Sequence, residues 1–215
     1  MAHPYWPLFD LRVRTPRLEL RPDWDEGLVE MAEAAAAGIH DPAEMPFFEP
    51  WTDAPPGDLE RNALQFAWRV RAAIAPDKWQ VNFLVAFDGR VIGMQSVESA
   101  HFARTRTVET GSWIGRTYQG QGIGKEMRAA VLHFAFIGLG AERAESGAFF
   151  DNPASLAVSR ALGYVDNGED IKVRRGQPAR LVNLLLTRER WDATRPELPV
   201  SIDGLEPCLP LLGAG

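Results

Sequence analysis

The sequence predicts an α/β fold (α+β in some usages) in which helices flank one mixed β-sheet. Two observations carry this prediction: strand-like and helix-like patterns alternate along the chain, and two adjacent strands are joined by a two-residue turn. A length of 215 residues with 46% hydrophobic and 24% charged residues matches an ordinary soluble domain and excludes intrinsic disorder. The predicted order of elements is β-α-α-β-β-β-α-β-α-β.

The first part of the chain predicts one strand and two helices. Alternating apolar and polar residues over 18–21 predict the strand, and helical periodicity over 24–37 predicts a helix that ends at Gly38. Residues 40–56 include five prolines and several aromatic side chains, which favours a rigid, irregular connection. A second helix is expected over 58–73.

Three strands are expected next. Residues 81–87 and 91–97 are apolar runs separated by Asp88-Gly89, a pair typical of a tight hairpin turn. Residues 107–115 form the third predicted strand, which leads into a glycine cluster.

The clearest helix begins at residue 123 and ends near 138–140, because its apolar residues recur at helical spacing. A strand over 143–150 follows. Asn152 is then predicted to be an N-cap, with Pro153 as the first residue of a helix that runs to Leu162. The last core strand is expected over residues 181–187.

Two segments are divided by composition. We expect a domain over residues 1–191, including an aromatic leader, and a Pro-rich tail over 192–215. The tail contains apolar pairs, so it can be flexible, lie along the domain or lie along a partner subunit. The apolar tail also suggests a homodimer.

Charge and cysteine content exclude several classes of protein. The net charge of −6 opposes general binding to nucleic acid or to anionic membranes. A single cysteine, Cys208, excludes an internal disulfide framework and a thiolate zinc site, and no metal-binding constellation is recognised. Residues 1–7 lack the features of a signal peptide, and residues 129–141 are too short to span a bilayer. We therefore expect a cytoplasmic protein.

The segment 119–125, Gln-Gly-Gln-Gly-Ile-Gly-Lys, follows a strand and opens a helix. Glycines permit a tight turn and close approach of a ligand, while a helix start offers unpaired N–H groups and a positive dipole end. These features predict a phosphate or pyrophosphate site, and a plain tight turn is the alternative. A dinucleotide fingerprint fails because Lys125 stands where a small residue is required, and a P-loop fails at Gln119 and Glu126.

Gln119-x-x-Gly122-x-Gly124 resembles the acyl-CoA pyrophosphate loop of the GNAT superfamily of N-acetyltransferases. The likeness extends from about Arg17 to Trp191 and includes the segments 109–115, 152–155 and 162–164. This resemblance implies a mostly antiparallel sheet with splayed central strands. Within the superfamily, the sequence is similar to the RimJ/RimL-like branch. The leader, together with 40–42 and 45–47, resembles an actinobacterial subgroup labelled succinyltransferase.

The resemblance implies a set of cofactor-binding residues. Main-chain groups of Trp113, Ile114 and Gly115 would pair with pantetheine amides, and Asn152 would bond the cofactor arm. The pyrophosphate would be held by main-chain N–H groups of Gln119, Gly120, Gln121, Gly122, Ile123 and Gly124.

Catalytic residues are also implied. Glu109 matches an acidic position of the family pattern and is the candidate general base, through a water molecule; a solvated surface glutamate is the alternative. His40 and His101 compete with it because histidine titrates near neutrality. Ser155 matches a serine placed near the sulfur and would bind the cofactor and protonate the thiolate. A tyrosine that many members carry is replaced here by Ser159.

The acceptor is expected between the connections 40–51 and 100–106, with His40, Phe47, Trp51 and His101 as lining residues. The predicted function is acetyl transfer from acetyl-CoA to a primary amine of a small molecule or peptide, without a metal. Succinyl transfer from succinyl-CoA is an alternative, for which Lys78, Arg104 or Arg106 would bind the extra carboxylate. A non-catalytic acyl-CoA sensor or interaction module is the alternative from another class.

Overall fold

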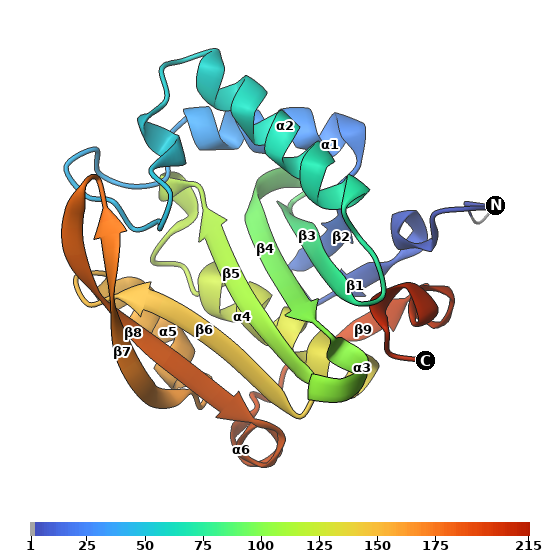
Figure 1. The fold of residues 1–215 in the computed structure, drawn as a ribbon. Helices are drawn as coiled ribbons and strands as arrows, with labels where there is room; N and C mark the ends of the chain where they lie inside the picture. The colour runs from blue at the N-terminus through green and yellow to red at the C-terminus, as the bar shows by residue number, and fades with distance from the viewer. Residues whose placement is uncertain (1–2) are drawn as a thin grey trace.

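The computed structural model describes residues 3–215, and these residues form a nine-stranded mixed sheet. Its order is β7-β8-β6-β5-β4-β3-β2-β1-β9, and each neighbouring pair is antiparallel except β5 and β6. The mixed, mostly antiparallel sheet flanked by helices is thus confirmed (Figure 1). The strands are Arg12–Arg14 (β1), Leu18–Pro22 (β2), Lys78–Phe87 (β3), Arg90–Ala100 (β4), Thr107–Ile114 (β5), Arg143–Phe149 (β6), Val165–Arg174 (β7), Gln177–Thr187 (β8) and Ser201–Asp203 (β9).

Helices cover both faces of this sheet. Helices α1 and α2 lie together on one face, and α4 and α5 lie on the other (Figure 1). The α-helices are Asp25–Ala36 (α1), Asp58–Ala72 (α2), Phe102–Thr105 (α3), Ile123–His133 (α4), Pro153–Ala161 (α5) and Arg188–Thr194 (α6). A π-helical turn, Phe134–Gly138, extends α4, and short 3-10 turns are Pro7–Asp10, Trp51–Asp53, Arg116–Tyr118, Glu206–Cys208 and Pro210–Leu212.

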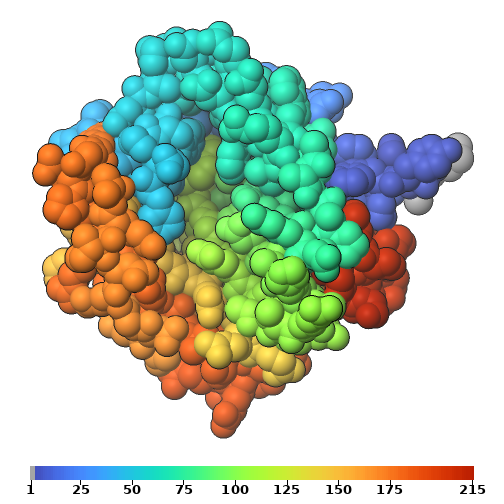
Figure 2. Space-filling view, viewed as in Figure 1, coloured from blue at the N-terminus to red at the C-terminus, as the bar shows by residue number. Residues whose placement is uncertain are grey.

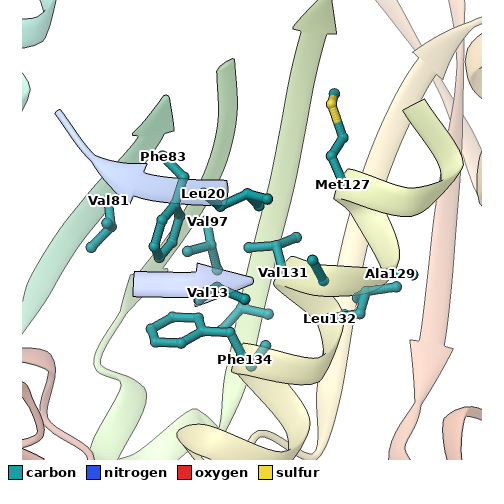
Figure 3. Packing of buried hydrophobic residues seen from close by; sticks show 14 of the residues in the cluster. Val13, Leu20, Val81, Phe83, Val97, Met127, Ala129, Val131, Leu132 and Phe134 are labelled. Carbon is teal, nitrogen blue, oxygen red and sulfur yellow. The ribbon is translucent and has the colours of Figure 1, made fainter. Parts of the chain in front are cut away.

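The main hydrophobic core lies between the sheet and α4. Val13, Leu20 and Val97 project from the strands toward Val131 on the helix, as Figure 3 shows. Phe83 of β3 meets Phe134 edge to face with ring centroids 5.3 Å apart. A second core joins the opposite face of the sheet to α1 and α2. Both sides of the central strands are therefore covered, so the sheet is a rigid support for the loops that leave it.

The hairpin and the N-cap are confirmed in detail. Asp88 and Gly89 both have positive φ angles, 50° and 77°, as a two-residue hairpin turn requires. Asn152 Oδ1 accepts a hydrogen bond from the Ser155 N–H at 3.1 Å, with Pro153 as the first helical residue.

Three strands were not expected from the sequence. Strand β7 is exposed along nearly its whole length, and its Asp-Asn-Gly-Glu-Asp stretch shows no apolar alternation. Strands β1 and β9 have three residues each, which is too short for a periodic signal.

The C-terminal segment packs against the domain. Strand β9 pairs with β1, Ile202 opposite Val13, and Cys208 and Leu212 are fully buried in the main core. Burial raises the pKa of the Cys208 thiol to about 11. Within residues 3–215, no helix combines the length and apolar character that crossing a bilayer requires; of the leader examined for a signal peptide, Met1 and Ala2 lie outside the described residues.

We expect Gly93→Ala in β4 to destabilise the fold. A Cβ atom there would lie 2.3 Å from Trp113 O and 2.7 Å from Ile114 Cα, both backbone atoms of β5. Because overpacking costs about 1–3 kcal/mol, the free energy of unfolding in urea should fall by that amount. Gly124→Ala is the control, since its Cβ would have no neighbour within 4 Å; equal losses in both variants would contradict the prediction.

Candidate functional site

An opening lies between β5 and β6. The two parallel strands pair only at Thr107–Arg143, Val108–Ala144 and Glu109–Glu145, and beyond this vertex they diverge. The rest of β5 stays paired with β4 through Gly93–Ile114. Within residues 3–215, the main chain of β5 has no backbone partner on this edge from residue 110 onward, and only the side chains of Thr110 and Ser146 still bridge to β6 there, which confirms the expected splay.

The register decides which main-chain groups face this opening. The Gly115 N–H donates to Ile92 O at 2.8 Å, and its carbonyl accepts from the Tyr118 N–H at 3.0 Å. Since the groups of an antiparallel strand alternate in direction, those of Trp113 also point to β4, whereas those of Ser112 and Ile114 face the opening. The expectation for Trp113 and Gly115 therefore changes: their main-chain groups serve the fold.

The glycine loop presents a row of free donors. Gly120 and Gly122 have φ angles of 74° and 77°, a conformation that favours glycine. No atom in residues 3–215 accepts a hydrogen bond from the N–H groups of residues 120–125, and helical bonding resumes at the Glu126 N–H, which donates to Gly122 O at 3.1 Å. Unpaired amides at the start of α4 suit an anion such as a pyrophosphate.

Side chains hold this loop in place. Gln119 Nε2 donates to Ile39 O at 2.7 Å and to Ile114 O at 3.1 Å, which ties the loop to the end of β5. Glu126 accepts from Thr15 Oγ1 at 2.6 Å and pairs with Arg17 at 2.5 Å. Arg17 thereby offsets the one carboxylate in the first turn of α4, a role that no local pattern indicated.

Three carboxylates lie in a row on the face of the sheet opposite α4. Glu98 of β4 is directly opposite Glu109 of β5, which is paired with Glu145 of β6. Partial burial and the neighbouring Glu145 raise the pKa of Glu109, while Lys172 lowers it. The pKa of Glu98 is raised by partial burial and then by Glu109.

These carboxylates line a cavity of about 560 Å³. Its walls include Val70 and Ala73 from the end of α2 and Gln80 of β3. Figure 2 shows the surface also hollowed between α2 in teal, the blue segment before it and the orange hairpin of β7 and β8, although neither that segment nor the hairpin lines the carboxylate cavity. Glu145 was not singled out from the sequence, because only the parallel register of β6 places it beside Glu109.

An aromatic cluster lies farther along the same face of β5. His40, Phe47, Trp51 and Trp113 follow one another with ring centroids 5.6, 5.2 and 5.8 Å apart. His40 Nδ1 contacts Asp41 O and Nε2 contacts Thr52 Oγ1, both at 2.8 Å. A histidine with both nitrogens engaged is a poor candidate for a base.

His101 does not join this group. It is exposed at the end of β4 with a left-handed φ of 57°, beside the cavity residue Ala100. The structure thus brings together three of the four expected acceptor residues and places the fourth apart.

A latch connects the segment 40–56 to the β7–β8 hairpin. Arg175 pairs with Asp53 at 2.6 Å and donates to Pro42 O at 3.1 Å, and Arg174 pairs with Asp151 at 2.6 Å and donates to Met45 O at 3.0 Å. Hydrogen bonds from these arginines lower the pKa values of both carboxyl groups. One ion pair, Arg175 with Asp53, therefore joins the two walls of the hollow, and Arg174 adds a hydrogen bond to Met45 O.

Ser155 and Glu109 occupy different parts of the opening. Ser155 is half-buried in the first turn of α5, beyond the end of β6, and its hydroxyl has no hydrogen-bond partner within residues 3–215. Glu109 lies at the vertex. Ser159, at the position of the tyrosine that is missing, is fully buried. Tyr164 Oη lies 3.2 Å from Thr110 Oγ1 at the vertex.

Comparisons with known proteins identify the fold and the family. Solved structures with the same fold include a putative acetyltransferase from T. thermophilus (22% identity, TM-score 0.67, 86% of this chain and 93% of that chain). They also include Mycobacterium smegmatis RimJ in complex with CoA-disulfide (17%, 0.68, 85% and 90%) and RimL in complex with coenzyme A (17%, 0.65, 80% and 95%). A family model described as acetyltransferase (GNAT) domain matches residues 17–165. The chain belongs to this family of GNAT acetyltransferases.

Proposed function

We propose that the protein transfers an acetyl group from acetyl-CoA to a primary amine. The observation that carries this proposal is the opening between β5 and β6, which has free loop amides on one side and a carboxylate-lined cavity on the other. An anionic donor and a cationic acceptor would thus enter from opposite faces of the sheet. The two substrates would meet in the opening, next to the vertex.

The donor fits the α4 side. Its pyrophosphate would accept hydrogen bonds from the amides of residues 120–125, the part of the predicted loop that the structure leaves free. Its pantetheine amides would pair with the open edge of β5 at the main-chain groups of Ser112 and the N–H of Ile114, whose carbonyl already accepts from Gln119 Nε2. The side-chain oxygen of Asn152 is used in the N-cap, and its nitrogen, which has no partner among residues 3–215, would bond the same arm.

The acceptor fits the carboxylate side. A neutral amine must lose a proton after it attacks, and Glu109, whose raised pKa makes it a stronger base, would take that proton through a water molecule. The new C–N bond forms as the C–S bond breaks, and the sulfur takes the bonding electron pair. A free main-chain N–H of the open β5 edge would polarise the thioester carbonyl, and Ser155 would return a proton to the sulfur.

The class of amine follows from the cavity. Three carboxylates favour a cationic acceptor, and the aromatic cluster of His40, Phe47, Trp51 and Trp113 offers an apolar wall farther along β5. RimL is named as a ribosomal L7/L12 alpha-N-protein acetyltransferase, which supports a peptide amine as one acceptor of this kind. For a succinyl donor, Lys78 at the cavity is the best placed of the three cations considered.

Thermal unfolding with acetyl-CoA, succinyl-CoA, free CoA and ATP tests the donor. A ligand that binds only the folded state at 100 times its Kd adds about 2.7 kcal/mol. Stabilisation by CoA compounds and not by ATP is expected, followed by acetylation of amines in a mass-spectrometric assay. A larger shift with succinyl-CoA would favour succinyl transfer, binding without turnover on any amine would favour a sensor, and no shift would overturn the proposal.

We expect Ser155→Ala to reduce kcat by about tenfold or more, because the thiolate then leaves without its proton donor. The KM for acetyl-CoA should change little, since the Asn152 cap uses the main-chain N–H of residue 155 and not the hydroxyl. Ser155→Thr, which keeps a hydroxyl, is the matched control. An unchanged kcat in the alanine variant would remove Ser155 from the mechanism.

A further inference from the structure

A buried arginine joins the strands on both sides of the opening. Arg128 of α4 is 3% exposed. Its guanidinium donates to Ser112 Oγ of β5 at 2.9 Å, to Ser146 Oγ of β6 at 3.2 Å and to Gln95 Oε1 of β4 at 3.3 Å. Each of the three nitrogens thus bonds a different strand, and two of those strands are the ones that diverge.

The charge of Arg128 has no carboxylate partner among residues 3–215. Arg128 forms no ion pair there, and its bonds go to neutral side chains. The other residues on the α4-facing side of the central strands are also uncharged: Val97, Ser99, Val108, Thr110, Ile114, Ala144 and Ala148. The nearest acid of α4, Glu126, is already paired with Arg17.

Such an arrangement is costly for the folded protein. Burying a guanidinium without an opposite charge carries a desolvation penalty of several kcal/mol, which neutral hydrogen bonds offset only in part. An apolar residue of similar length would avoid this penalty, since the adjacent helix positions Met127 and Val131 are apolar and buried. The retained charge therefore points to an anionic group that enters the opening.

One other titratable side chain belongs to this network. Tyr164 is 3% exposed and lies 3.2 Å from Thr110 Oγ1, while Ser146 Oγ donates to Thr110 O at 3.2 Å. Burial raises the pKa of Tyr164, and the charge of Arg128 lowers it. The phenol is therefore neutral near pH 7 and does not compensate Arg128.

We propose that Arg128 is a positioning residue that fixes the opening between β5 and β6 and favours the thiolate form of the CoA that is released there. The proposal rests on the proposed acetyl transfer and deepens it. When the amine attacks, the thioester C–S bond breaks and its electron pair goes to sulfur, so one negative charge develops on the donor. A fixed, uncompensated cation beside the donor's channel stabilises that charge and costs no reorganisation at the moment of reaction.

The proposal predicts a measurable property of the product complex. Coenzyme A bound to the protein should have a lower thiol pKa than free CoA, whereas desulfo-CoA, which lacks the sulfur, has no such proton to lose. If binding lowers a thiol pKa of about 8.5 by one unit, the affinity for CoA relative to desulfo-CoA rises about sevenfold between pH 6.5 and 9. The ratio of the two affinities is unaffected by titration of the phosphates, which both ligands carry, and of Tyr164, which is present in both complexes.

The experiment is calorimetric titration of both ligands across this pH range in five proteins. Wild type and Arg61→Gln, an exposed cation of α2 that pairs with Asp58, should show the rise. Arg128→Gln and Arg128→Met should still bind desulfo-CoA but should not show the rise in the affinity ratio with pH. Arg128→Lys keeps the positive charge, so this variant should show part of the rise. The two neutral variants differ in polarity, so at least one is expected to fold.

The outcomes distinguish a failure of the proposed acetyl transfer from a failure of the role proposed for Arg128. If desulfo-CoA does not bind the wild type, the proposed function fails. If both ligands bind the wild type with the same pH dependence, or if Arg128→Met retains the rise, the donor site stands and the role of Arg128 is overturned. A purely structural arginine would lower thermal stability in every Arg128 variant without changing the affinity ratio.

Discussion

Gly124→Asp should weaken acetyl-CoA binding by at least about a hundredfold and leave the fold intact. Gly124 lies in the first turn of α4, and a Cβ there meets no atom within 4 Å, so the new side chain has room. An acid in the first turn of a helix is itself stabilising. Two like charges 4 Å apart repel by about 4 kcal/mol at an effective dielectric of 20, which exceeds the 2.7 kcal/mol of a hundredfold loss.

Calorimetry with acetyl-CoA, combined with thermal unfolding, measures this effect. Gly124→Ala and Gly124→Asn are the controls. The alanine adds only a Cβ atom, and the asparagine adds a side chain of the same size as aspartate without its charge. Binding of acetyl-CoA by Gly124→Asn but not by Gly124→Asp would assign the loss to charge. If the aspartate variant binds within about threefold of wild type, the loop is a plain turn.

Glu109→Gln should lower kcat by about a hundredfold or more, because a positioned general base contributes about 10²–10⁴ to the rate. The Kd for acetyl-CoA should be unchanged, since Glu109 lies on the face of the sheet opposite the α4 loop. Steady-state rates with a saturating amine and calorimetric titration of the donor give the two quantities. A glutamine variant with wild-type kcat would return Glu109 to the role of a surface carboxylate.

The pH profile gives a sharper test of the same residue. A base must be unprotonated, so activity should fall as the pH drops through the pKa of Glu109, which lies above its ordinary value. Glu145→Gln removes the like charge beside it, so the acidic limb of kcat/KM should move to lower pH while the plateau stays high. A limb that does not move would show that another group titrates.

Much of the fold could be predicted because its main elements are periodic. The hairpin at Asp88-Gly89 and the cap at Asn152 depend on contacts within a few residues, so local sequence suffices. Strand β7 could not be predicted, since its residues are solvated on both faces and its pairing with β8 is set at a distance. The predicted helix to residue 138 is in fact α4 followed by a π-helical turn, which apolar spacing alone does not distinguish.

The candidate site likewise contains residues that local sequence predicts and residues that it does not. The glycine loop could be proposed from the sequence because glycine and helix-start signals are local. Arg128 and Glu145 were not predicted. A charged residue on a helix is ordinarily expected to face solvent, whereas Arg128 is buried. The parallel register that places Glu145 beside Glu109 cannot be read from the sequence of β5 or of β6. The direction of the main-chain groups of Trp113 likewise depends on its pairing with Met94.

The latch made by Arg174 and Arg175 has a consequence for how the protein meets its surroundings. The pair of Arg175 with Asp53, which joins the hairpin to the segment 40–56, is partly exposed, and at 1 M salt the screening length falls to about 3 Å, close to the separation of the two charges. The core beneath them depends on apolar contact and is insensitive to such screening. At molar salt the hairpin should therefore separate from the segment 40–56 more readily, so the range of amines accepted would change while the melting temperature hardly does.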